Sequence, residues 1–224
     1  MRENTLFARL RDSCAEDWEA FVTHPFVQGI QDGTLPEACF RHYLIQDYLF
    51  LIHFGRAYAL AAYKGDTLED IRAAAESLRV ITDVEMRLHV AFCKDWGLSE
   101  VDMQAAPEAE ENMAYTRYVL ERGMAGDVLD LHVALAPCMG GYGDIGKRLS
   151  ENPATKWEGN PYRPWIEMYA GEEYQEGTAH SLSAMDRLYE RRAGENRIPD
   201  LIRTFQQATR LEIRFWQMGM DAAA

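Results

Sequence analysis

At 224 residues, the chain fits one domain, 1–224, better than two small ones, because a single hydrophobic core can still grow at this length. Hydrophobic residues make up 47% of the sequence and aromatic residues 11%, which argues against an intrinsically disordered protein. The net charge is -13 and the basic residues are scattered, so binding to nucleic acid phosphates is disfavoured.

The first predicted helix covers about residues 4–23, where Leu6, Leu10, Cys14 and Trp18 recur at helical spacing. Charged residues interrupt every apolar run in 1–12, so we expect neither a signal peptide nor a membrane span. An apolar loop, 24–33, is expected to fold over helix ends. Thr34 and Glu37 then form a capping box with a proline inside it, which predicts the start of a helix over 35–63.

Asp47 interrupts one of the most apolar stretches of the chain, inside the predicted helix 35–63. Helical spacing places Tyr43, Phe50 and Phe54 on the same face, which gives an aromatic wall containing one acid. Burial of a carboxylate is costly unless it receives hydrogen bonds. Asp47 is therefore either a site residue, or a structural residue that pairs with an arginine such as Arg41 or Arg56 or accepts a hydrogen bond from a tyrosine.

The next predicted helices span about 67–96 and 107–122. Glu108, Glu110 and Glu111 are expected to form a solvated first turn of the second one, with no chemical role. Glu85 and His89 are four residues apart, but no repeated Glu-x-x-His pair of the di-iron type is present. The spacing predicts no metal site.

Cys138 lies in the predicted helix 127–151, directly after Pro137 and four residues before Tyr142. Proline and the nearby glycines, Gly140 and Gly141, weaken a helix, which suggests that they clear space beside a site. A free cysteine is often an inert, buried apolar residue, and that alternative applies to Cys138 as well. The four cysteines form no C-x-x-C pair, which favours reduced thiols in a cytoplasmic protein over a disulfide scaffold.

The last predicted helices span about 161–170, 172–193 and 198–219. The final one carries Glu212, which shares a helix side with Phe215 and Trp216. Glu212 is either a second inward acid or an exposed residue. The periodicity along the whole chain predicts an all-α fold of roughly seven to nine helices, with nearly no period-two alternation.

Four segments together resemble the TenA family, the group of thiaminase II or aminopyrimidine aminohydrolase. They are His24 to Pro36, Gln46-Asp47 followed by His53-Phe54, Leu135-Ala-Pro-Cys138, and Glu212-x-x-Phe-Trp216. The resemblance runs in order over nearly the whole chain. It implies an all-helical heme-oxygenase-like fold, a homotetramer, and hydrolysis of thiamin or of 4-amino-5-aminomethyl-2-methylpyrimidine to hydroxymethylpyrimidine in thiamin salvage, with no metal or organic cofactor.

Carried over by this resemblance, Cys138 matches the family's nucleophile and Glu212 its acid/base carboxylate. Asp47 matches the carboxylate that reads the aminopyrimidine edge. The tyrosines around the ring correspond to Tyr115, Tyr142 and Tyr169. The chain departs from the family at Phe50, where many members have tyrosine, and at the small residues that follow Cys138; both departures leave the preferred leaving group open.

Two alternatives belong to other functional classes. One is a pyrimidine-binding or regulatory protein without catalytic activity, and the other is a metal or redox enzyme on the same scaffold, since a fold does not fix a function. Direct DNA contact by a regulator is disfavoured because the acidic chain has no basic helix.

Overall fold

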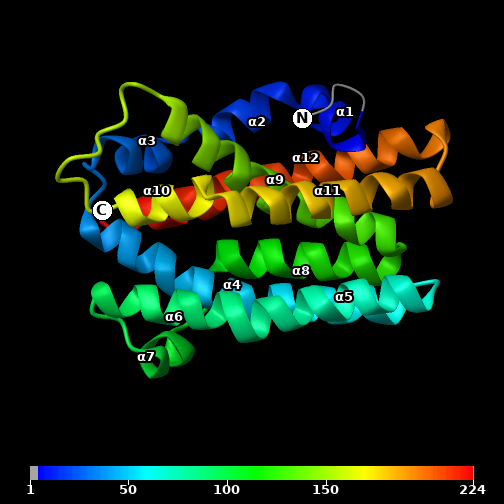
Figure 1. Ribbon diagram of the computed structural model, residues 1–224, viewed down its shortest axis with the longest axis horizontal. Coiled ribbons are helices and arrows are strands. Elements are labelled where there is room, and N and C mark those ends of the chain that lie inside the picture. Colours follow the sequence, from blue (N-terminus) through cyan, green and yellow to red (C-terminus); the bar gives the residue numbers. More distant parts are fainter. Residues whose placement is uncertain (1–4, 224) are drawn as a thin grey trace.

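The computed structural model describes residues 5–223, which form an all-helical bundle without a strand (Figure 1). The α-helices in chain order are α1 (Leu6–Ser13), α2 (Ala15–Val22), α3 (Pro25–Asp32), α4 (Glu37–Lys64), α5 (Leu68–Val80), α6 (Met86–Asp95), α7 (Glu100–Ala105), α8 (Glu110–Ala125), α9 (Val128–Glu151), α10 (Arg163–Ala170), α11 (Glu172–Arg192) and α12 (Ile198–Asp221). A π-helical turn, Ile81–Glu85, joins α5 to α6, and a 3-10 turn, Glu195–Arg197, precedes α12.

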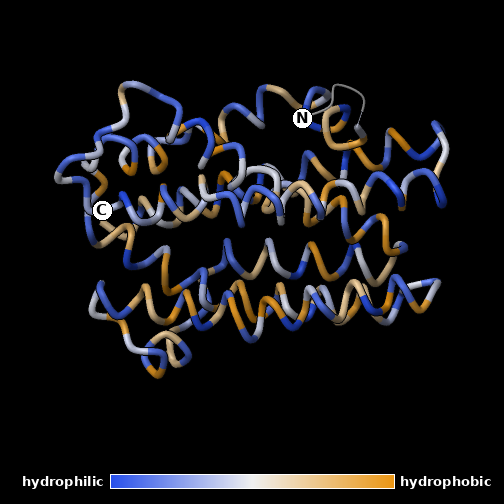
Figure 2. The backbone as a smooth tube through the Cα atoms, in the orientation of Figure 1, coloured by the Kyte–Doolittle hydropathy of each residue, from blue (hydrophilic) through white to orange (hydrophobic). Residues whose placement is uncertain are grey.

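The long helices α4, α8, α9 and α12 pack against one another and form the centre of the bundle (Figure 1). Helices α5 and α6 run along α4, while α1, α2 and α3 pack against α12. Apolar and polar residues alternate along most helices in Figure 2, as expected for helices that bury one face. The all-α prediction is therefore confirmed.

Two predicted helices are divided in the structure. The segment 4–23 breaks at Cys14, which separates α1 from α2, and the segment 67–96 is interrupted by the π-helical turn. Helix α7 was not predicted. At six residues, it is too short to show a clear apolar periodicity.

The prediction of a loop over 24–33 was wrong, because most of this segment is α3. The ring of His24 accepts a hydrogen bond from the Phe26 backbone N–H and caps the helix, with Pro25 as its first residue. Gly33 ends it in the left-handed conformation, at a φ of 68°. A proline at the start and a glycine just past the end are sequence signals of a short helix.

An aromatic cluster around Trp216 connects several helices. The Trp216 ring lies 4.8 Å from that of Phe26, 5.4 Å from that of Tyr43 and 5.3 Å from that of Tyr142, centre to centre. These residues belong to α12, α3, α4 and α9. The cluster fixes the relative positions of three helices that also carry the candidate site.

Gly140 and Gly141 of α9 have a different role from the one predicted. A Cβ atom on Gly140 would overlap the ring of Phe7, and one on Gly141 would overlap the ring of Phe21. These glycines therefore allow α1 and α2 to approach α9 closely, instead of clearing space for a ligand.

Replacing Gly141 with alanine is expected to destabilise the protein by about 1–3 kcal/mol, because the Phe21 ring would have to move within a packed core. Urea denaturation followed by circular dichroism measures this change. Gly177→Ala in α11 is the matched control, since a Cβ there meets nothing within 4 Å and alanine is the better helix former. Equal effects of the two substitutions would contradict this role for Gly141.

Candidate active site

A small cavity lies among the central helices, with an empty volume of about 160 Å³. Its lining comprises seven side chains from four helices: Asp47 and Phe50 of α4, Tyr115 of α8, Cys138 and Tyr142 of α9, and Glu212 and Phe215 of α12. Six of the seven predicted site residues thus meet around one cavity.

Helical spacing explains how α4, α9 and α12 each contribute a pair of residues, while α8 contributes Tyr115 alone. Asp47 and Phe50 are three positions apart, as are Glu212 and Phe215, while Cys138 and Tyr142 are four apart. Such pairs share one helix face, which points toward the cavity in each case. Phe215 was not predicted to line the site, although its position beside Glu212 was the available signal.

Glu212 is almost fully buried, with 2% of its surface exposed, so it is the inward acid. Its Oε1 accepts a hydrogen bond of 2.8 Å from the Tyr115 hydroxyl. Burial raises the pKa of Glu212 to about 8; the hydrogen bond from Tyr115 opposes this change, and the charge of Asp47 adds to it. At neutral pH, Glu212 is therefore mainly a carboxylic acid that can donate a proton.

Asp47 is paired with a histidine and not with an arginine. Its Oδ2 lies 3.4 Å from Nδ1 of His89, while Arg41 lies near Glu37 and Arg56 near His53. Burial raises the pKa of Asp47, and the His89 charge lowers it.

The other ring nitrogen of His89, Nε2, lies 2.9 Å from the Leu44 carbonyl oxygen. A carbonyl only accepts, so Nε2 must donate, and the neutral ring then has no hydrogen on Nδ1. Nδ1 of His89 therefore faces the Asp47 carboxyl group.

Cys138 is partly buried and its thiol faces the cavity. Burial raises the pKa of the Cys138 thiol well above its ordinary value, and the charges of Glu212, Asp47 and Glu85 add to this effect. These surroundings therefore favour the protonated sulfur. A reaction through the thiolate needs a group that removes the proton, or a bound positive charge that favours the thiolate.

Aromatic rings form the walls of the cavity. The Phe50 ring stacks on Tyr115 at 5.4 Å between centres and meets Phe215 edge-on at 6.0 Å. Tyr169 lies outside the lining, behind Tyr142, with ring centres 5.0 Å apart. A flat heterocycle would thus lie between aromatic faces, with its polar atoms directed at the carboxyl groups.

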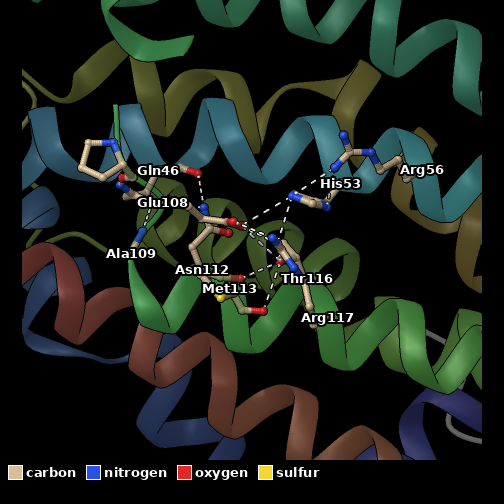
Figure 3. A network of polar contacts seen from close by, with 10 residues as sticks. Gln46, His53, Arg56, Glu108, Ala109, Asn112, Met113, Thr116 and Arg117 are labelled. Carbon is tan, nitrogen blue, oxygen red and sulfur yellow. Dashed lines mark hydrogen bonds and ion pairs between the residues drawn. The ribbon is translucent and has the colours of Figure 1, made fainter. Parts of the chain in front are cut away.

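A network of hydrogen bonds beside the cavity holds α4 against α8 (Figure 3). Buried Gln46 donates from its amide nitrogen to the Pro107 carbonyl at 3.0 Å and accepts from the Ala109 backbone N–H at 2.9 Å. The Asn112 amide donates to the Gln46 carbonyl at 2.9 Å. Gln46 precedes Asp47 in the sequence, so this network fixes the position of that acid.

The predicted solvated turn around Glu108 is only partly correct. The Glu108 side chain is 17% exposed and accepts hydrogen bonds of 2.6 and 2.7 Å from the Arg117 guanidinium, as Figure 3 shows. His53 lies 3.5 Å from the same carboxylate. Glu108 is therefore part of the contact between α4 and α8, which its place in an acidic run did not reveal.

Two further properties concern the whole of residues 5–223. Within this range, no group of three or more His, Cys, Asp or Glu side chains is arranged to hold a metal ion. None of the helices described in this range has the length and apolar character needed to cross a bilayer.

Residues 11–222 match the TENA/THI-4/PQQC family. The chain is 35% identical over 215 residues to the aminopyrimidine aminohydrolase of Halalkalibacterium halodurans, covering 96% of this chain and 95% of that protein.

Solved structures agree with this match. A TenA family transcription regulator from Silicibacter sp. TM1040 superposes with a TM-score of 0.92 at 44% identity, over 98% of this chain and 99% of that one. A protein of heme oxygenase-like fold from Shewanella denitrificans superposes with a TM-score of 0.74 at 13% identity, over 95% and 91% of the two chains, which supports the fold alone. The chain has a heme-oxygenase-like fold and belongs to the TENA/THI-4/PQQC family.

Proposed function

We propose that this protein is a hydrolase of thiamin salvage that converts 4-amino-5-aminomethyl-2-methylpyrimidine, thiamin, or both to hydroxymethylpyrimidine. The observation that supports this function most is the meeting of one thiol and two carboxyl groups, from α4, α9 and α12, in a cavity walled by aromatic rings. The aminopyrimidine aminohydrolase of Halalkalibacterium halodurans is a relative along nearly its whole length.

Asp47 is proposed to bind the aminopyrimidine edge. A 4-aminopyrimidine presents an amino donor next to the ring nitrogen N3, so one carboxyl group can make two hydrogen bonds with it. The proton between that carboxyl group and N3 can lie on either partner. The neighbouring His89, 3.4 Å from Asp47, helps to set its location. Phe50, Tyr115 and Phe215 hold the ring flat.

Glu212 is proposed to protonate the ring at N1, the nitrogen on the other side of the ring. Protonation makes the adjacent carbon, C6, electrophilic enough for addition of sulfur. The Cys138 thiol proton passes to Glu212 as that acid gives its own proton to N1, and the bond between sulfur and C6 forms. The net result of these two transfers is that the thiol proton has moved to N1.

Addition of sulfur breaks the aromaticity of the ring and allows the substituent on the C5 methylene to leave. The bond between the methylene and the leaving nitrogen breaks, and its electron pair departs with that nitrogen. The positive charge now lies on the amidine atoms beside Asp47. Water adds to the methylene carbon, and the proton that it loses goes to the departed ammonia or, with thiamin, to solvent. The carbon–sulfur bond then breaks, and N1 returns its proton through Glu212 to the thiolate. These steps need no metal or organic cofactor.

The test is a turnover assay of the purified protein with the aminomethylpyrimidine and with thiamin, side by side. Release of hydroxymethylpyrimidine from either compound is the expected result, and the ratio of the two kcat/KM values identifies the preferred leaving group. Phe50, which lacks the hydroxyl common in the family, bears on that ratio. Binding of both compounds without product would point instead to a non-catalytic pyrimidine-binding or regulatory protein.

Assembly and location are further parts of the proposal. The resemblance to TenA proteins predicts a homotetramer that acts in the cytoplasm on a small-molecule substrate. The number of subunits and the compartment are both predictions from this resemblance.

A further inference from the structure

Glu85 is an acid beside the cavity for which the proposed reaction has no use. It is the last residue of the π-helical turn Ile81–Glu85, between α5 and α6, and it is half-buried. Both of these helices run alongside α4, the helix of Asp47 (Figure 1). Single π-helical turns occur often at functional sites, where they redirect side chains.

Contacts on both sides of Glu85 locate it along α4. Four residues later, His89 contacts Asp47 and the Leu44 carbonyl oxygen. Three residues earlier, Thr82 faces Gly55, where an added Cβ would lie 3.6 Å from the Thr82 methyl group. The segments thus run antiparallel. Glu85 lies on the same helix face as His89. It is next to the part of α4 that runs between Asp47 and Gly55.

Charge effects connect Glu85 with residues of the cavity. Burial raises the pKa of Glu85 to about 7, and the charge of Asp47 adds to it. The Glu85 charge in turn raises the pKa values of Cys138 and Tyr58. Together with the contact between His89 and Asp47, these effects indicate that Glu85 lies on the side of Asp47 and Cys138.

The substituent on C5 of the pyrimidine points toward that side. With Asp47 at N3 and the 4-amino group, Glu212 at N1 and Cys138 at C6, the C5 methylene lies between the Asp47 edge and the sulfur. Its substituent is positively charged in both candidate substrates, as an alkylammonium or as a thiazolium. Asp47 and Glu85 give this side of the site two carboxyl groups against one histidine, His89, and an excess of acidic groups favours a cationic ligand.

We infer that Glu85 is a specificity-determining residue that binds the positively charged leaving group of the substrate. This inference depends on the proposed function for the orientation of the ring. Breaking the bond to the methylene returns an electron pair to the leaving nitrogen, which becomes neutral. The attraction to Glu85 is thus greatest in the bound substrate and weaker in the transition state, so it governs KM and not kcat.

The experiment compares Glu85→Gln with the parent protein. KM for the aminomethylpyrimidine, which is a cation, is expected to rise about tenfold, as for loss of one partly buried ion pair, without a fall in kcat. The inhibition constant of the neutral product hydroxymethylpyrimidine should stay within about twofold, since it makes no ion pair. Asp83→Asn removes an exposed charge from the same turn and is the matched control, with an unchanged KM expected.

Each other outcome overturns the inference. An unchanged KM for Glu85→Gln, or equal weakening of the cation and the neutral product, would mean that Glu85 does not select for charge. Lower kcat at constant KM would make it part of the chemical step instead. If the parent protein forms no product, the proposed function fails, and calorimetric binding of the two pyrimidines to parent and variant still decides the role of Glu85. Glu85→Asp keeps the charge, and its KM should lie between those of the parent protein and Glu85→Gln.

Discussion

Replacing Cys138 with serine is expected to lower the turnover of the aminopyrimidine by at least about 10³-fold while its binding changes little. A serine hydroxyl ionises far less readily than a thiol, and the carboxyl groups around the cavity oppose a negative charge at this position. Steady-state kinetics with purified variant and parent, together with calorimetric binding of the product, measure the two effects separately.

The control for this substitution is Cys14→Ser. Cys14 is buried between α1 and α2, and its sulfur donates to the Leu10 carbonyl at 3.4 Å, a contact that a hydroxyl can also make. The control should keep nearly all activity. Undiminished turnover by the Cys138 variant would end the assignment of Cys138 as nucleophile and leave the cavity as a site for direct attack by water.

Glu212→Gln is expected to lower kcat by about 10²–10⁴-fold, the usual range for loss of a general acid, with a smaller change in KM. Glutamine can still accept the hydrogen bond from Tyr115, so the shape of the cavity is kept. It cannot transfer a proton to the ring nitrogen. Unchanged kcat in this variant would remove Glu212 from the proposed reaction.

The pH dependence of the parent provides a second measurement for the same group. The reaction needs the protonated acid, and burial raises the pKa of Glu212 to about 8, so kcat should fall as the pH rises through about 8. The glutamine variant should lack this decline. In Tyr115→Phe the hydrogen bond that favours the charged form is lost, so the decline should move to higher pH.

Much of the fold could be predicted because helical periodicity and capping residues are local. The start of a helix near residue 35, for example, is confirmed by α4, which begins at Glu37. The capping box of Thr34 and Glu37 was wrong, because Pro36 is the cap residue and no side chain makes a capping hydrogen bond there. Helix α3 was not predicted because its apolar residues suggested a loop that covers helix ends. Pro25 and Gly33, which mark its two ends, were the signals of a helix.

Asp47, Glu212 and Cys138 could be selected from the sequence because a carboxylate or thiol in an apolar helical stretch is unusual, and the family resemblance pointed to the same residues. The contacts that these three residues make could not be predicted from the sequence. The contact of Asp47 with His89 joins residues 42 positions apart, and it depends on how α6 packs against α4. Local spacing suggested an arginine or a tyrosine as the partner of Asp47, and not a histidine.

The distribution of the cavity residues over α4, α8, α9 and α12 has a consequence for how the protein loses activity. None of these side chains is carried by a loop, so no small local motion can remove one and spare the others. In a denaturant titration, activity and helical structure should therefore be lost at the same denaturant concentration. An isolated fragment that lacks any one of the four helices is expected to form no site at all.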